Sequence, residues 1–196
     1  MGVPMEELSV LLSQLSCGDD EQAEQALSHL STLGPEAVGA LEKRLSHPEA
    51  EVRWWAVRAL CEVHDERVPE LLVQALADPD KSVRWCAGLA LRIRPSPQAS
   101  LALIGMLAEK EALTRRLAGD ALVAIGSQVV PQLLEAMQQG DQLVRLEAIR
   151  ALAKIGDPQA IPALFEALED SSALIEYWAS EGLEKMGVGM VFFKPD

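Results

Sequence analysis

Cysteine and histidine are among the residue types that could supply a nucleophile, a base or a metal ligand, and the chain has three of each. A metal site needs such side chains in a cluster, but His29, His47 and His64 lie far apart and show no H-E-x-x-H spacing. Cys61 and His64 could approach each other on one helix, yet this three-residue spacing arises freely in helices. The sequence therefore predicts no catalytic residue, no metal site and no cofactor, and it leans against an enzyme.

The charge and the apolar pattern narrow the class of partner. Lys plus Arg is 17 and Asp plus Glu is 30, which gives a formal net charge of −13. Nucleic acids and anionic membranes attract cationic surfaces, so no nucleic acid is expected as a partner. No run of about 18 uncharged apolar residues occurs, so no membrane insertion is expected. The odd number of widely spaced cysteines is typical of reduced thiols and predicts a cytoplasmic protein.

A phrase of ten residues recurs along the chain at nearly constant intervals. Its copies are EVRWWAVRAL (51–60), SVRWCAGLAL (82–91), LTRRLAGDAL (113–122), LVRLEAIRAL (143–152) and LIEYWASEGL (174–183). Their closing leucines, together with Leu27 at the end of a weaker first copy, follow one another at intervals of 30 to 33 residues. Repeats of this length indicate a solenoid, in which each unit buries its apolar face against its neighbours.

The spacing of apolar residues predicts two helices in each repeat. Each copy has apolar residues at the spacing of a helix, and a second amphipathic stretch lies between successive copies. We therefore predict an all-α fold, a right-handed α-α superhelix (solenoid) of about six helical hairpins that forms a single domain over 1–196. The predicted repeat units are 5–33, 35–66, 68–95, 97–126, 129–156 and 160–187, followed by a C-terminal cap over 188–196.

One position in each copy lies almost opposite the side of the helix that faces the core. From the second copy onward its occupants are Trp54, Trp85, Arg116, Leu146 and Tyr177. On the concave face of a solenoid this apolar stripe would bind another protein, with Arg58 and Arg150 orienting an acidic surface of that partner. The alternative is that curvature packs these side chains against the adjacent repeat as core. Trp55 and Trp178 lie on the flank of the core side and are expected to pack inside.

Four copies also carry an arginine one position before the outward residue: Arg53, Arg84, Arg115 and Arg145. An evenly spaced column of guanidinium groups would suit a polyanion. It would equally suit a structural ladder, in which each arginine pairs with a turn carboxylate such as Asp80 or Asp141 in a neighbouring repeat. We favour the structural ladder.

The repeat phrase and its flanks resemble a known family. The matching residues are Val83-Arg84, Ala87 and Ala90-Leu91 after Asp78-Pro79-Asp80, and Val144-Arg145, Ala148 and Ala151-Leu152 before Ile155-Gly156-Asp157-Pro158. Over almost the entire chain this pattern resembles HEAT repeats of the short type found in phycobilin lyase subunits. The resemblance implies the solenoid fold, but the same repeat serves more than one function.

Two functions follow from the resemblance and the residues together. The first is a non-catalytic protein-protein interaction scaffold, or adaptor, that binds a partner along the concave face. The alternative is a phycobilin lyase or chromophore-detaching subunit that acts on a light-harvesting phycobiliprotein, with a linear tetrapyrrole as its ligand. Because no acid-base pair is recognisable, the residues favour the scaffold.

Overall fold

The computed structural model describes residues 5–30 and 32–188, and in these residues it contains α-helices and short 3-10 helices but no strand. The all-α fold class is confirmed. The chain divides into two compact units, Met1–Ala99 and Ser100–Asp196. The predicted C-terminal cap beyond Val188 lies outside the described residues.

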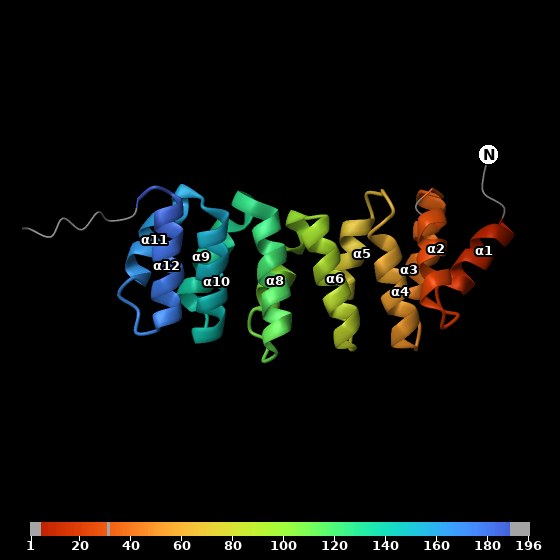
Figure 1. Cartoon of the computed structure of the whole chain (residues 1–196), viewed down its shortest axis with the longest axis horizontal. Helices are drawn as coiled ribbons and strands as arrows, with labels where there is room; N and C mark the ends of the chain where they lie inside the picture. Colours follow the sequence, from red (N-terminus) through yellow and green to blue (C-terminus); the bar gives the residue numbers. More distant parts are fainter. Residues whose placement is uncertain (1–4, 31, 189–196) are drawn as a thin grey trace, which may run out of the picture. The chain divides into compact units, whose positions relative to one another are not determined.

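The first unit consists of three helical hairpins (Figure 1). Its elements are α1 (Met5–Gln14), α2 (Asp20–Leu30), α3 (Pro35–Arg44), α4 (Ala50–Leu60), α5 (Val68–Ala75), α6 (Lys81–Ile93) and the 3-10 helix η1 (Pro97–Ala99). Each odd-numbered helix packs against the next even-numbered one, and α4 also packs against α6. The repeat phrases therefore form the second helix of each hairpin.

The second unit repeats this arrangement. Its elements are α7 (Ser100–Met106), α8 (Ala112–Ile125), η2 (Gly126–Val129), α9 (Val130–Gln139), α10 (Gln142–Ile155), η3 (Pro158–Ala160), α11 (Ile161–Ala167) and α12 (Ala173–Lys185). Here α10 packs against both α8 and α12. A continuous layer of second helices results, as stacking of repeats requires.

The core of both units is built from the leucines and alanines of the repeat phrase. All six closing leucines are at most 3% exposed: Leu27, Leu60, Leu91, Leu122, Leu152 and Leu183. The alanine four residues before each of the last five has no exposed surface: Ala56, Ala87, Ala118, Ala148 and Ala179. The leucines fill the space inside each hairpin, and the small alanines let neighbouring helices approach closely.

Proline and glycine mark the ends of the helices. Pro69 and Pro131 lie in the first turn of α5 and α9, where a missing N–H leaves no hydrogen bond unmade. Gly156 ends α10 in the left-handed conformation, with φ 71°, and its N–H donates to the carbonyl of Leu152. A side chain at that position would be strained, which explains the glycine.

The second unit contains one long apolar stretch. By length and composition alone, Ala112–Gln139 is long enough and apolar enough to cross a membrane. The structure divides it into α8, η2 and α9, and half of its most apolar window is buried inside the protein. The core of the second unit therefore accounts for about half of these apolar residues.

The arginines predicted to form a ladder bind the turns between helices. Arg53 donates to Asp78 through two nitrogens, at 2.7 and 2.9 Å, and its Nη1 donates to the carbonyls of His47 and Pro48. Arg145 forms the equivalent ion pair with Asp170. These bonds tie each turn to the next repeat, so the structural interpretation is confirmed for both.

The partners proposed for this ladder need correction. Among residues 5–30 and 32–188, Asp80 and Asp141 form no ion pair with an arginine. They cap α6 and α10 by accepting hydrogen bonds from backbone N–H groups. Arg84 and Arg115 bind carbonyls of the turn that precedes their own helix.

We expect the stability of the first unit to fall in acid through Asp78. Burial alone would raise the pKa of Asp78, but the hydrogen bonds from Arg53 and from the backbone N–H of Asp80 outweigh burial and lower it. A carboxyl with a lowered folded pKa stabilises the fold above its unfolded pKa of about 3.9 and loses that contribution as the pH falls further. Urea midpoints measured from pH 6 to pH 3 should therefore fall, and Asp78→Asn should flatten the fall. An unchanged pH profile in Asp78→Asn, with exposed Glu51→Gln as the control, would contradict this assignment.

We also expect a close approach of α10 and α12 to make Gly182 irreplaceable. A Cβ at Gly182 would lie 2.8 Å from the Cβ and 2.9 Å from the Cα of Ala153. Gly182→Ala should cost about 1–3 kcal/mol in the free energy of unfolding. Gly105→Ala in α7 is the matched control: its Cβ would meet nothing within 4 Å, so it should stabilise by about 0.5–1 kcal/mol. Chemical denaturation measures the free energy of unfolding of both variants, and equal values would contradict the close packing of α10 against α12 at Gly182.

Candidate protein-binding groove

A groove of about 560 Å³ opens between α4 and α6, entirely within the first unit. Its lining is mostly apolar: Trp54, Arg58, Cys61, Glu62, Ser82, Trp85, Cys86, Leu89, Ala90, Arg92 and Ile93. Both helices are repeat phrases that turn their alanines and closing leucines inward. The residues at the groove therefore come from the outward side of each phrase.

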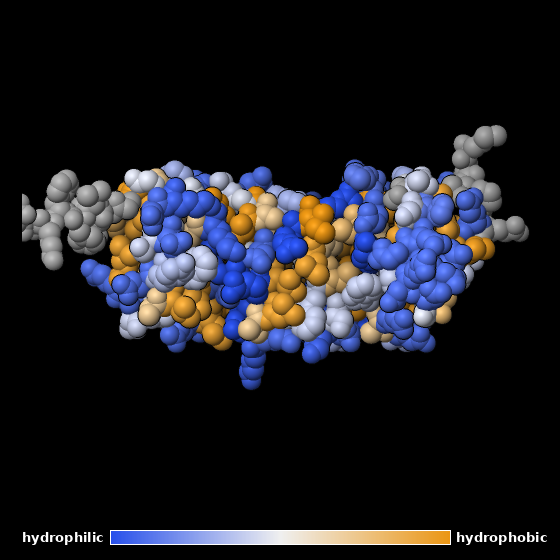
Figure 2. Space-filling view, in the orientation of Figure 1, coloured by the Kyte–Doolittle hydropathy of each residue, from blue (hydrophilic) through white to orange (hydrophobic). Residues whose placement is uncertain are grey.

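The apolar floor and edge of the groove come chiefly from α6. Trp85, Leu89 and Ile93 follow one another at four-residue spacing, which places them along one side of the helix. Trp85 is half-buried, Leu89 is 39% exposed and Ile93 is 66% exposed. Figure 2 shows hydrophobic surface over α6, near the middle of the view. This is an exposed apolar row on a helix whose opposite side is already buried.

The two groove tryptophans are held by neighbours of their own helices. The ring of Trp54 meets that of Trp55 edge to face, with centroids 4.8 Å apart and planes at 89°. Trp55 is only 6% exposed, so it anchors Trp54 to the core. The ammonium group of Lys81 lies 5.1 Å from the centroid of Trp85. Both indoles are thus positioned before any partner arrives.

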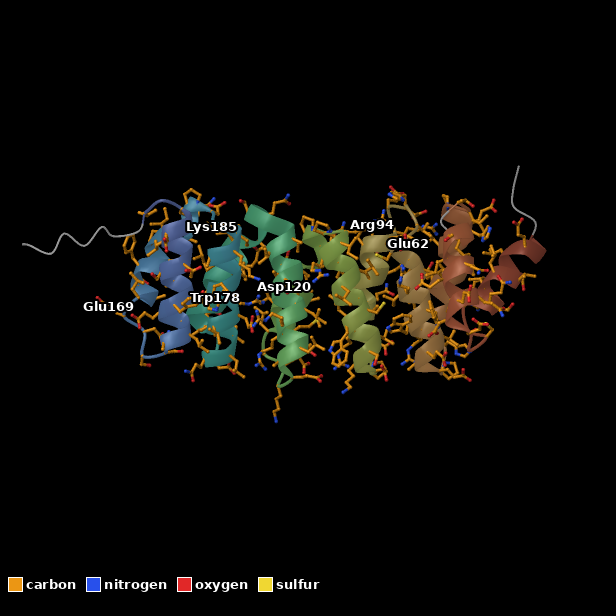
Figure 3. The ribbon with its side chains drawn as sticks, viewed as in Figure 1. Glu62, Arg94, Asp120, Glu169, Trp178 and Lys185 are labelled. Atoms are coloured by element: carbon orange, nitrogen blue, oxygen red, sulfur yellow. The ribbon has the colours of Figure 1, made fainter. Side chains whose placement is uncertain are left out.

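Charged side chains close one end of the groove. Arg58 pairs with Glu62 on its own helix and with Glu24 of α2. Arg94 reaches from the end of α6 to donate to the carbonyls of Cys61 and Val63 (Figure 3, where Arg94 and Glu62 are labelled). Because two carboxylates surround Arg58, its attraction for an acidic partner surface is reduced. The prediction that Arg58 orients such a surface stays a prediction.

The thiols at the groove are poor nucleophiles. Burial raises the pKa of Cys86 to about 12 and raises that of Cys61 as well. Both thiols are therefore protonated near neutral pH, whereas the thiolate is the reactive form. Within residues 5–30 and 32–188, no three His, Cys, Asp or Glu side chains gather as metal ligands would. What the groove offers is apolar and aromatic contact surface.

The repeats of this chain match one known family of helical repeats. A family model of HEAT repeats matches residues 8–92, 38–123 and 102–184. The chain belongs to the HEAT-repeat family.

Solved structures agree with a HEAT solenoid. An archaeal HEAT-like repeats protein from Thermococcus onnurineus NA1 is 18% identical, with a TM-score of 0.67 over 98% of this chain and 84% of that one. The complex of CpcE and CpcF of phycocyanin lyase from Nostoc sp. PCC7120 is 21% identical, with a TM-score of 0.53 over 95% of this chain and 79% of that one. A designed armadillo repeat protein in complex with a (KR)4 peptide is 21% identical, with a TM-score of 0.51 over 92% of this chain and 99% of that one. At these identities the likeness shows the fold alone. No curated protein matches the chain.

The other three residues of the outward stripe predicted to bind a partner lie in the second unit. Arg116 on α8 is exposed, Leu146 on α10 is half-buried, and Tyr177 on α12 is 52% exposed. The structure therefore brings Trp54 and Trp85 together at one groove and places these three on a different set of helices.

Arg150 corrects the sequence analysis. It is only 1% exposed and donates to Glu147 at 2.7 Å, to Asp120 at 2.9 Å and to the carbonyl of Arg116 at 3.3 Å. Burial would raise the pKa of Asp120, but hydrogen bonds from Arg150 and Lys154 lower it overall. All three guanidinium nitrogens are occupied inside the second unit, so Arg150 is not available to a partner.

The groove also contains residues that sequence reasoning missed. Leu89 and Ile93 were not proposed as contacts, although they lie four and eight residues after Trp85 on the same side of the helix. That spacing was the available signal. By helical period Val57 on α4 and Ile149 on α10 also lie on the outward side of their phrases, but both are at most 1% exposed. The flank of each phrase is therefore packed inside the unit, whereas Trp54, Trp85 and Leu146 of the stripe are half-buried.

Proposed function

We propose that this HEAT-repeat chain is a non-catalytic scaffold that binds another protein, and that the α4–α6 groove receives apolar side chains of the partner. The single observation that carries this proposal is the row of Trp85, Leu89 and Ile93 beside Trp54. Contiguous apolar surface of this kind, bordered by charged residues, marks protein contacts more often than it serves stability. The family and the fold supply the general class, since repeat solenoids present extended surfaces for binding.

The experiment is a pull-down from the native host with paired variants of exposed residues. Leu89→Ser together with Ile93→Ser removes the apolar row without touching the core. Val10→Ser on α1 is the control, because Val10 is also exposed (55%) but lies away from the groove. We expect a partner that the native chain and the control retain and that the double variant loses, with unchanged helical circular dichroism. Partners that bind all three chains equally would contradict the groove.

A second candidate is the chromophore-handling subunit implied by the resemblance to phycobilin lyases. Two indoles with Arg58 and Arg92 at one groove would suit the flat π-system and the carboxylates of a linear tetrapyrrole. Mixing the purified chain with a bilin distinguishes the candidates: a shifted visible absorption band favours the lyase class, and an unchanged spectrum favours the scaffold. We further propose a cytoplasmic location, because Cys17, Cys61 and Cys86 are all free thiols.

A further inference from the structure

The second unit carries an exposed leucine at the same place in three consecutive hairpins. Leu113, Leu143 and Leu174 are each the second residue of their helix, in α8, α10 and α12, and are 47%, 39% and 59% exposed. The same position in the first unit holds Glu51 in α4 and Ser82 in α6. Since two repeats fold with polar residues here, the leucines are not needed for the core.

A second row follows one turn along these helices. Leu146 and Tyr177 lie three residues after Leu143 and Leu174, and side chains at this spacing are neighbours on a helix surface. Because α10 packs against both α8 and α12, the three leucines lie on adjacent helices. We call Leu113, Leu143, Leu174, Leu146 and Tyr177 the leucine strip.

A pocket of about 370 Å³ lies further along α10 and α12 in the same unit. It is lined by Ala153, Lys154, Trp178, Glu181, Glu184 and Lys185 (Figure 3 labels Trp178 and Lys185). The sequence predicts that Trp178 packs inside, but it is only half-buried and lines this pocket. Glu181 lies four residues after Tyr177 on the same side of α12, so the pocket adjoins the strip.

The charges in this pocket favour a cation. The ammonium of Lys154 pairs with Asp120 at 3.2 Å, and that of Lys185 donates to the carbonyl of Lys154. Glu181 and Glu184 are exposed and form no ion pair with any residue of 5–30 or 32–188. Because Asp120 offsets Lys154, the carboxylates of Glu181 and Glu184 face one remaining ammonium, that of Lys185, and leave an excess of one negative charge. Beside an indole, this excess can hold a lysine or arginine side chain.

We propose that the leucine strip and this pocket together bind a basic amphipathic helix of a partner protein. The apolar side of that helix covers the strip, and one of its lysines or arginines enters the pocket against Trp178, Glu181 and Glu184. This surface is separate from the α4–α6 groove, so the two proposals stand or fall independently.

Geometry favours a helical ligand over an extended one. Packed helices lie about 8–10 Å apart, so successive leucines of the strip recur at about that distance. A helix laid across them returns to the same side every seven residues, about 10.5 Å. A β-strand places same-side residues about 6.7 Å or 13 Å apart, which fits neither. The two rows of the strip also need the broad apolar side that an amphipathic helix offers.

The test uses the full chain and a labelled peptide, KLLKLLKKLLKLLK, followed by fluorescence anisotropy. We expect binding that weakens about tenfold or more in Leu143→Ser/Leu174→Ser. Glu181→Gln/Glu184→Gln should weaken binding and reduce its dependence on salt. Leu101→Ser is the matched control, since Leu101 is 77% exposed on α7 outside the strip, and it should bind as the native chain does. Leu89→Ser/Ile93→Ser should also bind normally, which separates this surface from the groove.

Two further peptides complete the test. One replaces every lysine by glutamate, and the other replaces two central leucines by proline to prevent a helix. Both should bind at least about tenfold more weakly than the parent. The proposal is overturned if the parent peptide does not bind, if the strip variant binds it undiminished, or if either altered peptide binds as well as the parent.

Discussion

Replacing Arg150 by leucine is expected to lower the free energy of unfolding by about 3–5 kcal/mol. The guanidinium of Arg150 is 1% exposed and bonded to Glu147 and Asp120. Without it, the side chain of Glu147, itself only 10% exposed, keeps a negative charge in a site from which water is largely excluded. Such an uncompensated charge is what makes the loss large. The free energy of unfolding is measured by urea denaturation, with circular dichroism as the signal.

Two further variants serve as controls for the stability of Arg150→Leu. Arg116→Ala removes an exposed arginine from the neighbouring helix and should change stability by no more than about 0.5 kcal/mol. Glu147→Leu with Arg150→Leu removes both charges and installs the residue type found at the same positions in other repeats, Leu117 and Leu89. The double variant should recover most of the loss. If Arg150→Leu is no less stable than Arg116→Ala, Arg150 is not the buried centre of this network.

Trp55→Ala is expected to cost about 3–5 kcal/mol, whereas Trp85→Ala should cost about 1 kcal/mol or less. Trp55 is 6% exposed, and its loss opens a cavity in the core of the first unit. Trp85 is half-buried on the outward side of α6, where the ammonium of the flexible Lys81 side chain lies over its ring. The pair therefore separates a core tryptophan from a surface one by stability alone.

The same denaturation series can also refute this distinction. A loss above about 3 kcal/mol in Trp85→Ala would make that residue part of the core, and its role in partner binding would fall. A small loss in Trp55→Ala would mean that the predicted packing side of α4 is misassigned. Both variants need the same check of helical content before the free energies are compared.

The fold could be predicted because its signal is local and repeated. Each closing leucine, such as Leu60 or Leu122, recurs in a phrase with helical period, and six copies reinforce one another. The outward position was predictable for the same reason, since 100° per residue places Trp54 and Trp85 away from the leucines. These inferences need no knowledge of which helix lies beside which.

The errors arose where a side chain depends on residues far away in the sequence. Arg150 has the same position in its phrase as exposed Leu89, but it is buried, and it bonds both to Glu147 on its own helix and to Asp120 thirty residues upstream. Val57 has no exposed surface, although helical period alone places it on the outward side of its phrase. The ladder partners failed similarly: Asp78 and Asp80 are two residues apart in one turn, and turn geometry decides which meets Arg53 and which caps α6.

The accessibility of Trp85 tests the central claim most directly. Chains that keep only one of the four tryptophans, with phenylalanine at the other three, allow acrylamide quenching to be measured for Trp85 and Trp55 separately. We predict several-fold stronger quenching of Trp85 than of Trp55 in the folded chain. Equal protection of the two indoles would show that the α4–α6 surface is closed to solvent, and a groove open to a partner would then be contradicted.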